Sequence, residues 1–256
     1  MKEDRHFVTA LARGLAVLAC FRSSDRVLSN QEIARRCRLA KSTVSRLTHT
    51  LTKLGYLIQL DHDGRYALGT ATLSLGSAML ARLNVRALAR PAMQALADFS
   101  HATMSMGTYA QLHMIYVEHC RSHEALTLAL DVGSRIPVAT SAIGRAYLTA
   151  LGPEARDEVL AEVRDHDPKR WPRLRAAVNK AVADYAELGC CTSFGDWQPD
   201  INGIAVHFRQ GESLPPMALN CGGLASTLTP KFLLKEVRPR LIRIARDLEE
   251  ALGTRR

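Results

Sequence analysis

Two short helices joined by a tight turn constrain the fold of this chain more than any other feature of its sequence. Ser29 followed by Glu32 is a capping-box pattern, in which the serine caps a helix and the glutamate reaches back to its start. The next helix is predicted over residues 41–54, because apolar side chains recur there at three- and four-residue steps. Gly55 follows as a left-handed stop. The sequence therefore predicts a helix-turn-helix unit.

A β-hairpin is predicted immediately after these helices. Residues 56–60 and 65–68 have strand patterns, and Asp63-Gly64 between them is a strong turn signal. An amphipathic helix over residues 7–21 precedes the whole unit. Helix, helix-turn-helix and hairpin together predict a winged helix-turn-helix, complete in the first 69 residues.

The positive charge of the chain is concentrated in the same region. Lys and Arg outnumber Asp and Glu by 34 to 25 over the 256 residues. Residues 1–69 carry 12 basic and six acidic side chains, so this quarter of the chain holds +6 of the formal net charge of +9. Such an asymmetry favours a polyanionic partner for the N-terminal region.

The polar face of the 41–54 helix has the chemistry of a DNA-reading surface. It carries no carboxylate, its short hydroxyls permit close approach, and the Arg46 guanidinium has the length and fork to read guanine. Lys41 and Lys53 are placed to contact DNA phosphate groups, and Arg65 is placed to enter the adjacent minor groove. An ordinary amphipathic surface helix is the alternative. The predicted DNA-binding residues are Lys41, Ser42, Thr43, Ser45, Arg46, His49, Lys53 and Arg65.

After residue 70 the chain alternates between strand and helix patterns. Apolar helices are predicted over residues 71–83 and from about 84 to 100, the second with Pro91 inside it or at its start. The mixture that follows predicts a sandwich of a sheet and flanking helices, and the fold class is α+β. Candidate strands are 106–111, 114–118, 126–130, 190–194, 204–208 and 216–220, and candidate helices are 141–151, 154–163, 172–188 and 230–252.

Other motifs exclude whole classes of function. The six cysteines show neither a C-x-x-C pattern nor zinc-ligand spacing, so we expect reduced thiols and no metal. The motifs G-x-S-x-G and H-E-x-x-H and a phosphate-binding glycine-rich loop are absent, which predicts no catalytic residues, no cofactor and no enzyme activity. No apolar run reaches the ~18 residues of a membrane span, and Arg13 interrupts the apolar N-terminal segment. We expect a cytoplasmic protein with no membrane partner.

Residues 28–69, LSNQEIARRCRLAKSTVSRLTHTLTKLGYLIQLDHDGRYALG, resemble the DNA-binding domain of the IclR family of bacterial transcriptional regulators. The resemblance continues through VGSRIPVATSAIGRAYL (132–148), GDWQPDINGIAV (195–206) and PMALNCGG (216–223), in the same order and over nearly the whole chain.

The resemblance implies three parts: a winged helix-turn-helix domain over residues 1–69, a linker helix over 70–84 and a GAF-like α/β sandwich over 85–256 that binds a small organic effector. It implies a homodimer or a dimer of dimers. The expected partners are double-stranded DNA with a palindromic operator and a small organic acid, with RNA polymerase left open as a further contact.

The start of the 141–151 helix is a candidate anion site. Thr140-Ser141 look like a helix cap, so the N–H groups of Ala142, Ile143 and Gly144 would point outward and favour a carboxylate. The alternative is a helix end capped only by its own side chain. In the family this loop closes over the acid group of the effector.

The resemblance adds the loop before the 204–208 strand and the end of the 216–220 strand to the site. Some members of the family use a cysteine at about the position of Gly203 and serines near Leu219 and Cys221, and this chain departs at those points. We therefore expect a larger acid, such as an aromatic one, rather than a glyoxylate- or pyruvate-sized ligand. Asp196 could instead be a solvated loop carboxylate. The predicted effector-binding residues are Ser141, Ala142, Ile143, Gly144, Asp196, Ile201, Asn220 and Cys221.

The function expected from these features is a ligand-responsive, one-component DNA-binding transcriptional regulator that controls the catabolism of a small organic or aromatic acid. The alternative is a non-specific nucleic-acid-binding module without ligand-controlled output. Steep salt dependence without preference for a palindrome would identify the alternative, because phosphate contacts alone behave in that way.

Overall fold

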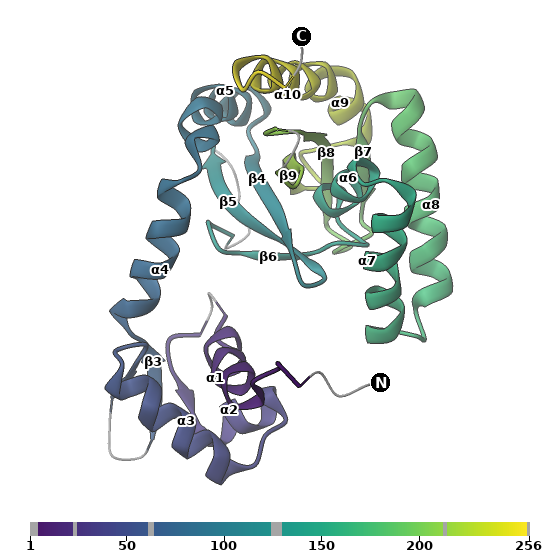
Figure 1. The fold of residues 1–256 in the computed structure, drawn as a ribbon. Helices are drawn as coiled ribbons and strands as arrows, with labels where there is room; N and C mark the ends of the chain where they lie inside the picture. The colour runs from purple at the N-terminus through teal and green to yellow at the C-terminus, as the bar shows by residue number, and fades with distance from the viewer. Residues whose placement is uncertain (1–4, 23–24, 61–63, 124–129, 212–213, 255–256) are drawn as a thin grey trace. The chain divides into compact units, whose positions relative to one another are not determined.

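The computed structural model describes residues 5–22, 25–60, 64–123, 130–211 and 214–254 (Figure 1). Asp63 and most of the candidate strand 126–130 lie outside the described residues. The chain divides into two compact units, residues 1–82 and 83–256. Within the described ranges, no helix has the length and apolar character that crossing a membrane requires.

The N-terminal unit has the helices and the hairpin that its sequence predicts. Its three-stranded antiparallel sheet has the order β1-β3-β2, and its first strand was not predicted. The elements are α1 (Thr9–Ala19), β1 (Leu28–Ser29), α2 (Asn30–Cys37), α3 (Lys41–Lys53), β2 (Leu57–Gln59), β3 (Arg65–Leu68) and α4 (Thr70–Ala81).

Local signals set the ends of these helices. The Ser29 hydroxyl accepts a hydrogen bond from the N–H of Glu32 at 3.2 Å, whereas the Glu32 carboxylate pairs with Arg36 at 3.4 Å. One half of the predicted capping box is therefore present. Gly55 ends α3 with a φ of +75°, as predicted. Leu54, the last residue of the predicted helix and part of its apolar repeat, is 61% exposed, because it follows the last helical residue, Lys53.

The C-terminal unit is built on one six-stranded antiparallel sheet with the order β6-β5-β4-β9-β8-β7. Figure 1 shows α5 and α10 side by side over one face, while α6 packs on the other face, followed by α8 and α7. The elements are α5 (Asn84–Ser100), β4 (Thr103–Ala110), β5 (His113–Arg121), β6 (Arg135–Pro137), α6 (Ala142–Ala150), α7 (Pro153–His166), α8 (Trp171–Leu188), β7 (Cys191–Phe194), β8 (Ile201–Phe208), β9 (Met217–Leu224), α9 (Pro230–Phe232) and α10 (Arg238–Ala251).

Two parts of this unit differ from the sequence prediction. The short strand β6 was not predicted, because three residues carry no alternating pattern. The helix expected over 230–252 contains a π-helical turn, Leu233–Val237, between α9 and α10. Pro239 has no N–H with which to continue the i→i−4 pattern, which accounts for the irregular turn just before it.

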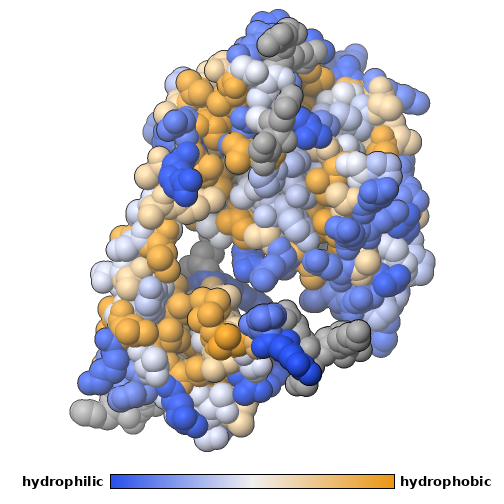
Figure 2. All heavy atoms as spheres, in the orientation of Figure 1, coloured by the Kyte–Doolittle hydropathy of each residue, from blue (hydrophilic) through white to orange (hydrophobic). Residues whose placement is uncertain are grey.

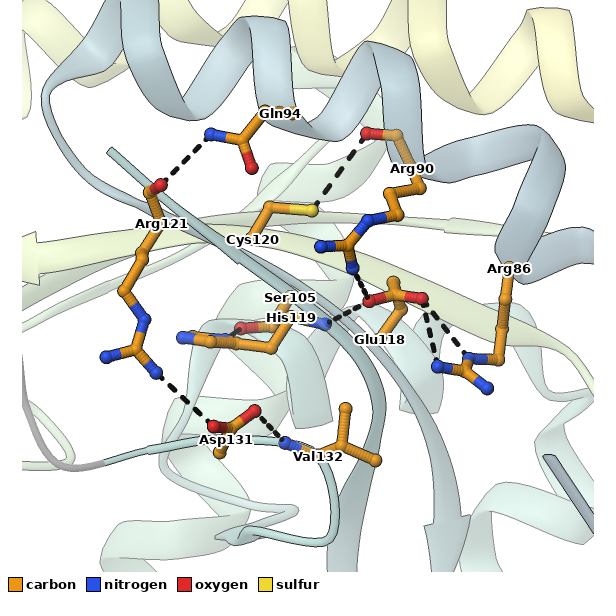
Figure 3. Close-up of polar contacts among 10 residues, drawn as sticks. All are labelled: Arg86, Arg90, Gln94, Ser105, Glu118, His119, Cys120, Arg121, Asp131 and Val132. Atoms are coloured by element: carbon orange, nitrogen blue, oxygen red, sulfur yellow. Dashed lines mark hydrogen bonds and ion pairs between the residues drawn. The ribbon is translucent and has the colours of Figure 1, made fainter. Parts of the chain in front are cut away.

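An ion-pair cluster around one buried carboxylate fixes α5 to the sheet (Figure 3). The carboxylate of Glu118 on β5 is 4% exposed and accepts hydrogen bonds from Arg86 at 3.2 Å and from Arg90 at 2.6 Å. Both arginines belong to the first half of α5. The cluster therefore holds that half of the helix against the strand.

An irregularity in the β4–β5 ladder changes which side chains share a face. Met106 pairs with Glu118 but Gly107 pairs with Tyr116, so Val117 is an extra residue in β5. As a consequence Tyr116 and His119, which are three positions apart, both lie on the α6 face of the sheet. Their rings stack with centroids 5.9 Å apart.

Candidate DNA-binding face and effector cavity

Helix α3 separates its side chains into two sets. Val44 and Thr48 are buried against the core of the N-terminal unit. Of the predicted DNA-binding residues, Thr43 is half-buried and the others are exposed: Lys41, Ser42, Ser45, Arg46, His49, Lys53 and Arg65. The surface that the sequence predicts is thus present and accessible in this unit.

One residue of this face is held in position by α2. The Ser45 hydroxyl donates to the carbonyl of Lys41 at 3.1 Å and accepts from the Asn30 amide at 2.8 Å. Sequence reasoning missed Asn30, because no local pattern indicates a contact across 15 positions. Asn30 therefore orients a hydroxyl of the candidate face from the preceding helix.

A cavity lies between the sheet and the N-terminus of α6 in the C-terminal unit. Its empty volume is about 390 Å³, counting the part that opens to solvent, and we call it the α6 cavity. Five of the predicted effector-binding residues line it: Ser141, Ala142, Ile143, Ile201 and Asn220. Four further lining residues belong to the 193–203 segment that the resemblance adds to the site: Ser193, Trp197, Asn202 and Gly203. Lining residues that the prediction did not include are Thr103, Tyr116, Leu130, Ile136, Gly222 and Gly223.

The cap of α6 leaves two N–H groups for a ligand. Ser141 accepts a hydrogen bond from the N–H of Gly144 at 3.2 Å, so Gly144 is not the free donor that was predicted. The first intrahelical bond runs from the N–H of Arg145 to the carbonyl of Ser141 at 3.0 Å. The N–H groups of Ala142 and Ile143 precede that bond and have no hydrogen-bond acceptor within the described ranges of the chain.

Gly144 has a packing role instead. A Cβ atom at this position would lie 2.1 Å from the carbonyl oxygen of Val138, so only glycine permits the close approach of α6 to that segment. Gly144 is not among the residues that line the α6 cavity, and it lets α6 pack closely against Val138.

Asp196 does not line the α6 cavity. Its carboxylate accepts a hydrogen bond at 2.7 Å from Arg145, whose side chain is 7% exposed. The same guanidinium donates to the carbonyl oxygens of Ala139 at 3.2 Å and Thr192 at 2.8 Å. A buried cation needs a counter-charge, and Asp196 supplies one to Arg145.

Cys221 also lies away from the α6 cavity. It follows Asn220 on β9, and successive side chains of a strand point to opposite faces. Its thiol contacts the Ser100 hydroxyl at 3.6 Å on the α5 side. Burial there raises the pKa of the Cys221 thiol to about 12, with the Ser100 hydrogen bond opposing the shift.

The lining of the α6 cavity is electrically neutral. Among the described residues, no Lys, Arg, His, Asp or Glu side chain contributes to it. The described residues also hold no group of His, Cys, Asp and Glu side chains that could bind a metal ion. An anion in this cavity would therefore be held by N–H, hydroxyl and amide donors and by the helix dipole.

Comparison with known proteins gives matches over both units. The sequence model of the IclR helix-turn-helix domain matches residues 10–61, and that of the bacterial transcriptional regulator IclR C-terminal domain matches residues 77–250. The HTH-type transcriptional regulator TsaQ1/TsaQ2 of Comamonas testosteroni is 30% identical over 251 residues, which cover 97% of this chain and 90% of that protein.

Solved structures share the fold. An IclR family transcriptional regulator from Brucella abortus is 40% identical, with a TM-score of 0.88 and coverage of 98% of this chain and 95% of that one. An IclR homologue from Microbacterium hydrocarbonoxydans, complexed with 4-hydroxybenzoate, is 24% identical with a TM-score of 0.69, and covers 96% of this chain and 98% of that one.

Proposed function

Since the chain belongs to the IclR family of bacterial transcriptional regulators, we propose that a small carboxylic acid in its α6 cavity controls its binding to DNA. Members of this family are DNA-binding regulators rather than enzymes. The observation that carries the proposal is the pairing, in one chain, of an acid-free basic helix face with a neutral cavity at a helix N-terminus. The regulated genes would serve the catabolism of the acid, which is an aromatic acid in our proposal.

The proposed DNA contact is made by α3 in the major groove. Arg46 reads base edges, while Lys41 and Lys53 contact phosphate. Arg65, exposed on β3, reaches the adjacent minor groove.

We propose that the N-terminal unit binds DNA as a homodimer. Helix α4 contains no charged side chain and no buried residue, and Leu73 and Leu75 on it are 70% and 61% exposed. Phe7, Leu11 and Leu15 add exposed apolar surface at α1, and Figure 2 shows hydrophobic residues gathered over this unit. An isolated helix of 12 residues is marginal in water. A second copy of the same uncharged helix would cover α4 without burying an unpaired charge.

A symmetric pair of α3 helices would read a palindromic operator, with half-sites about one helical turn apart or a multiple of it. A dimer of dimers would engage two such sites.

The acid group of the ligand would bind the N–H groups of Ala142 and Ile143. Helix N-termini favour anions through both the dipole and direct hydrogen bonds. Trp197, Ile136 and Leu130 line the same cavity and would contact an apolar or aromatic body.

Control of DNA binding requires that the acid prefer one arrangement of the dimer over another. A tenfold preference corresponds to about 1.4 kcal/mol, which one or two hydrogen bonds can supply. Binding would shift the population of dimers whose α3 helices match the operator spacing.

The decisive experiment measures operator affinity with and without a panel of acids. The purified protein is titrated into a labelled duplex from its own promoter region, with benzoate, 4-hydroxybenzoate and small aliphatic acids as candidates. We expect saturable binding, discrimination against scrambled duplex and a shift with at least one acid. Sequence-independent binding with a steep salt slope and no response to any acid would favour the non-specific module instead.

A further inference from the structure

We propose that Tyr116 donates a hydrogen bond to the effector, and that Ser105 and His119 fix the direction of that bond. The preferred ligand is then an acid that carries a second acceptor oxygen, such as a ketone carbonyl. This inference rests on the proposed function, because it concerns the ligand of the same cavity.

Three side chains form a buried polar chain at the α6 cavity. Tyr116 lines the cavity, and burial raises its pKa to about 12, with hydrogen bonding by Ser105 opposing the shift. The Ser105 hydroxyl lies 2.9 Å from Nδ1 of His119 (Figure 3). The exposed fractions of Tyr116, Ser105 and His119 are 4%, 1% and 7%. These three side chains are therefore largely shielded from bulk water.

The hydrogen atoms on these three side chains can be assigned by counting hydrogen-bond donors. Burial lowers the pKa of His119, so the ring is neutral near pH 7 and carries one N–H. Its Nε2 is buried and has no hydrogen-bond partner in the part of the chain that the structure describes.

A hydrogen on Nε2 would leave a buried N–H unpaired, and orphaned buried N–H groups are rarer in proteins than under-satisfied acceptors. We therefore assign the hydrogen to Nδ1 of His119, which donates to the Ser105 oxygen. Ser105 has one hydrogen, and it donates that hydrogen to the oxygen of Tyr116. The hydrogen of Tyr116 is then free to point into the cavity.

The other hydroxyls of the cavity already use their hydrogens. Thr103, Ser141 and Ser193 each donate to a backbone carbonyl oxygen, at 2.7, 2.6 and 2.9 Å respectively. Tyr116 is thus the one hydroxyl among the described lining residues whose hydrogen is left for a ligand. A ligand carbonyl would pair with it, whereas a methylene group would leave a buried donor unsatisfied.

The test uses pairs of acids that differ in a single carbonyl oxygen. Binding of 4-acetylbenzoate is compared with 4-ethylbenzoate, and 4-oxo-4-phenylbutanoate with 4-phenylbutanoate, by calorimetry on the full-length protein. We expect the wild type to bind the keto member of a pair roughly tenfold more tightly. Tyr116→Phe should abolish that preference, and it should not weaken binding of the methylene member, because no buried donor is then left unpaired and the ring still stacks on His119.

Ser105→Ala tests whether Ser105 positions the Tyr116 hydroxyl, since it interrupts the hydrogen-bonded series of side chains but keeps that hydroxyl. It should reduce the keto preference, and combining it with Tyr116→Phe should add no further loss. Ser193→Ala is the matched control, because that hydroxyl lines the same cavity but donates to a carbonyl of the protein. It should leave the preference intact.

The outcomes separate this inference from the proposed function. Equal wild-type affinity for both members of each pair, or a keto preference that survives Tyr116→Phe, overturns the role of Tyr116 while the acid site stands. An equal loss of affinity for both members of a pair in Tyr116→Phe also overturns it, because the tyrosine would then contact the carboxylate that both acids share. Failure of every acid, benzoate included, to bind the wild type overturns the proposed function and this inference with it.

Discussion

Nη1 of Arg90 lies 2.6 Å from Oε1 of Glu118, and the second oxygen of that buried carboxylate lies 3.2 Å from Arg86. The backbone N–H of His119 also donates to Oε1 at 3.1 Å. The Glu118 carboxylate thus accepts three hydrogen bonds, two of them from side chains of α5. Both arginine side chains are more exposed to solvent than the carboxylate.

Glu118→Ala should destabilise the C-terminal unit. Breaking a buried ion pair costs about 3–5 kcal/mol, and the partial exposure of both arginines reduces the expected loss to about 2–3 kcal/mol. Urea unfolding followed by circular dichroism would measure it. Asp165→Ala, which removes an exposed pair with Arg164, is the control and should change stability by less than about 0.5 kcal/mol. Equal effects of the two substitutions would contradict the anchoring role.

Arg46→Ala should weaken binding to the operator by roughly 1–3 kcal/mol while leaving folding intact. The loss should be larger on the operator than on scrambled duplex, because base contacts carry the discrimination. Fluorescence anisotropy with both duplexes measures the difference. Arg164→Ala, an exposed arginine of the other unit, is the control. A loss of the same size on both duplexes would show that Arg46 contacts only phosphate.

Ala142→Asp should abolish the response to acids and spare DNA binding. Ala142 is the first residue of α6 and lines the cavity, so a carboxylate there would occupy the proposed anion site. Ala142→Asn has nearly the same shape without the charge and should retain part of the response. Ligand titrations monitored by thermal unfolding compare the two variants. An undiminished titration in Ala142→Asp would mean that the acid binds elsewhere.

Leu73→Glu should weaken the proposed dimer, because it places a charge on the uncharged helix α4. Sedimentation over a range of concentrations should show dissociation at concentrations at least tenfold higher than for the wild type, since burying one such charge costs more than about 1.4 kcal/mol. Ser74→Glu puts the same charge on the neighbouring exposed position and is the comparison. A dimer that is unaffected by Leu73→Glu would place the interface away from this side chain.

His207 should make the stability of the C-terminal unit depend on pH. Its ring stacks on Tyr185 with centroids 4.7 Å apart, and its Nδ1 lies 3.1 Å from the Thr149 hydroxyl. Burial lowers its pKa to about 4, from about 6.5 in the unfolded chain. The unfolded state therefore binds more protons between these values, and stability falls as pH decreases from 6.5 towards 4, by up to about 1.4 kcal/mol per pH unit.

The check on His207 is unfolding by urea between pH 5 and 7.5 in the wild type and in His207→Gln. The variant has no titrating ring, so its stability should vary less over this range. The histidines common to both proteins contribute equally to the two slopes. Identical slopes would show that His207 is not the group responsible.

Local signals predicted the elements whose ends depend on a few neighbouring residues. Ser29, Gly55 and Ser141 each mark a helix boundary through a contact within three positions or through their own φ angle. The polar face of α3 could be predicted for the same reason, because helical period alone separates it from Val44.

The parts that the sequence did not reveal depend on contacts between distant segments. Asp196 is held by Arg145 across 51 positions, which no local pattern indicates. Tyr116 joins the cavity lining because the extra residue Val117 shifts the register of β5, and a strict period of two places it on the face opposite His119. Strand β9 is buried on both faces, so its composition does not reveal which face Cys221 occupies.

The alternation along β9 assigns two different roles to neighbouring residues of a single strand. Asn220 contributes to the chamber that would select the ligand, and its neighbour Cys221 belongs to the packing layer beneath α5. In the proposed site, substitutions at Asn220 would change ligand recognition without disturbing that layer. Such a strand would let descendants of one scaffold sense different metabolites, and it offers positions at which a biosensor could be retuned.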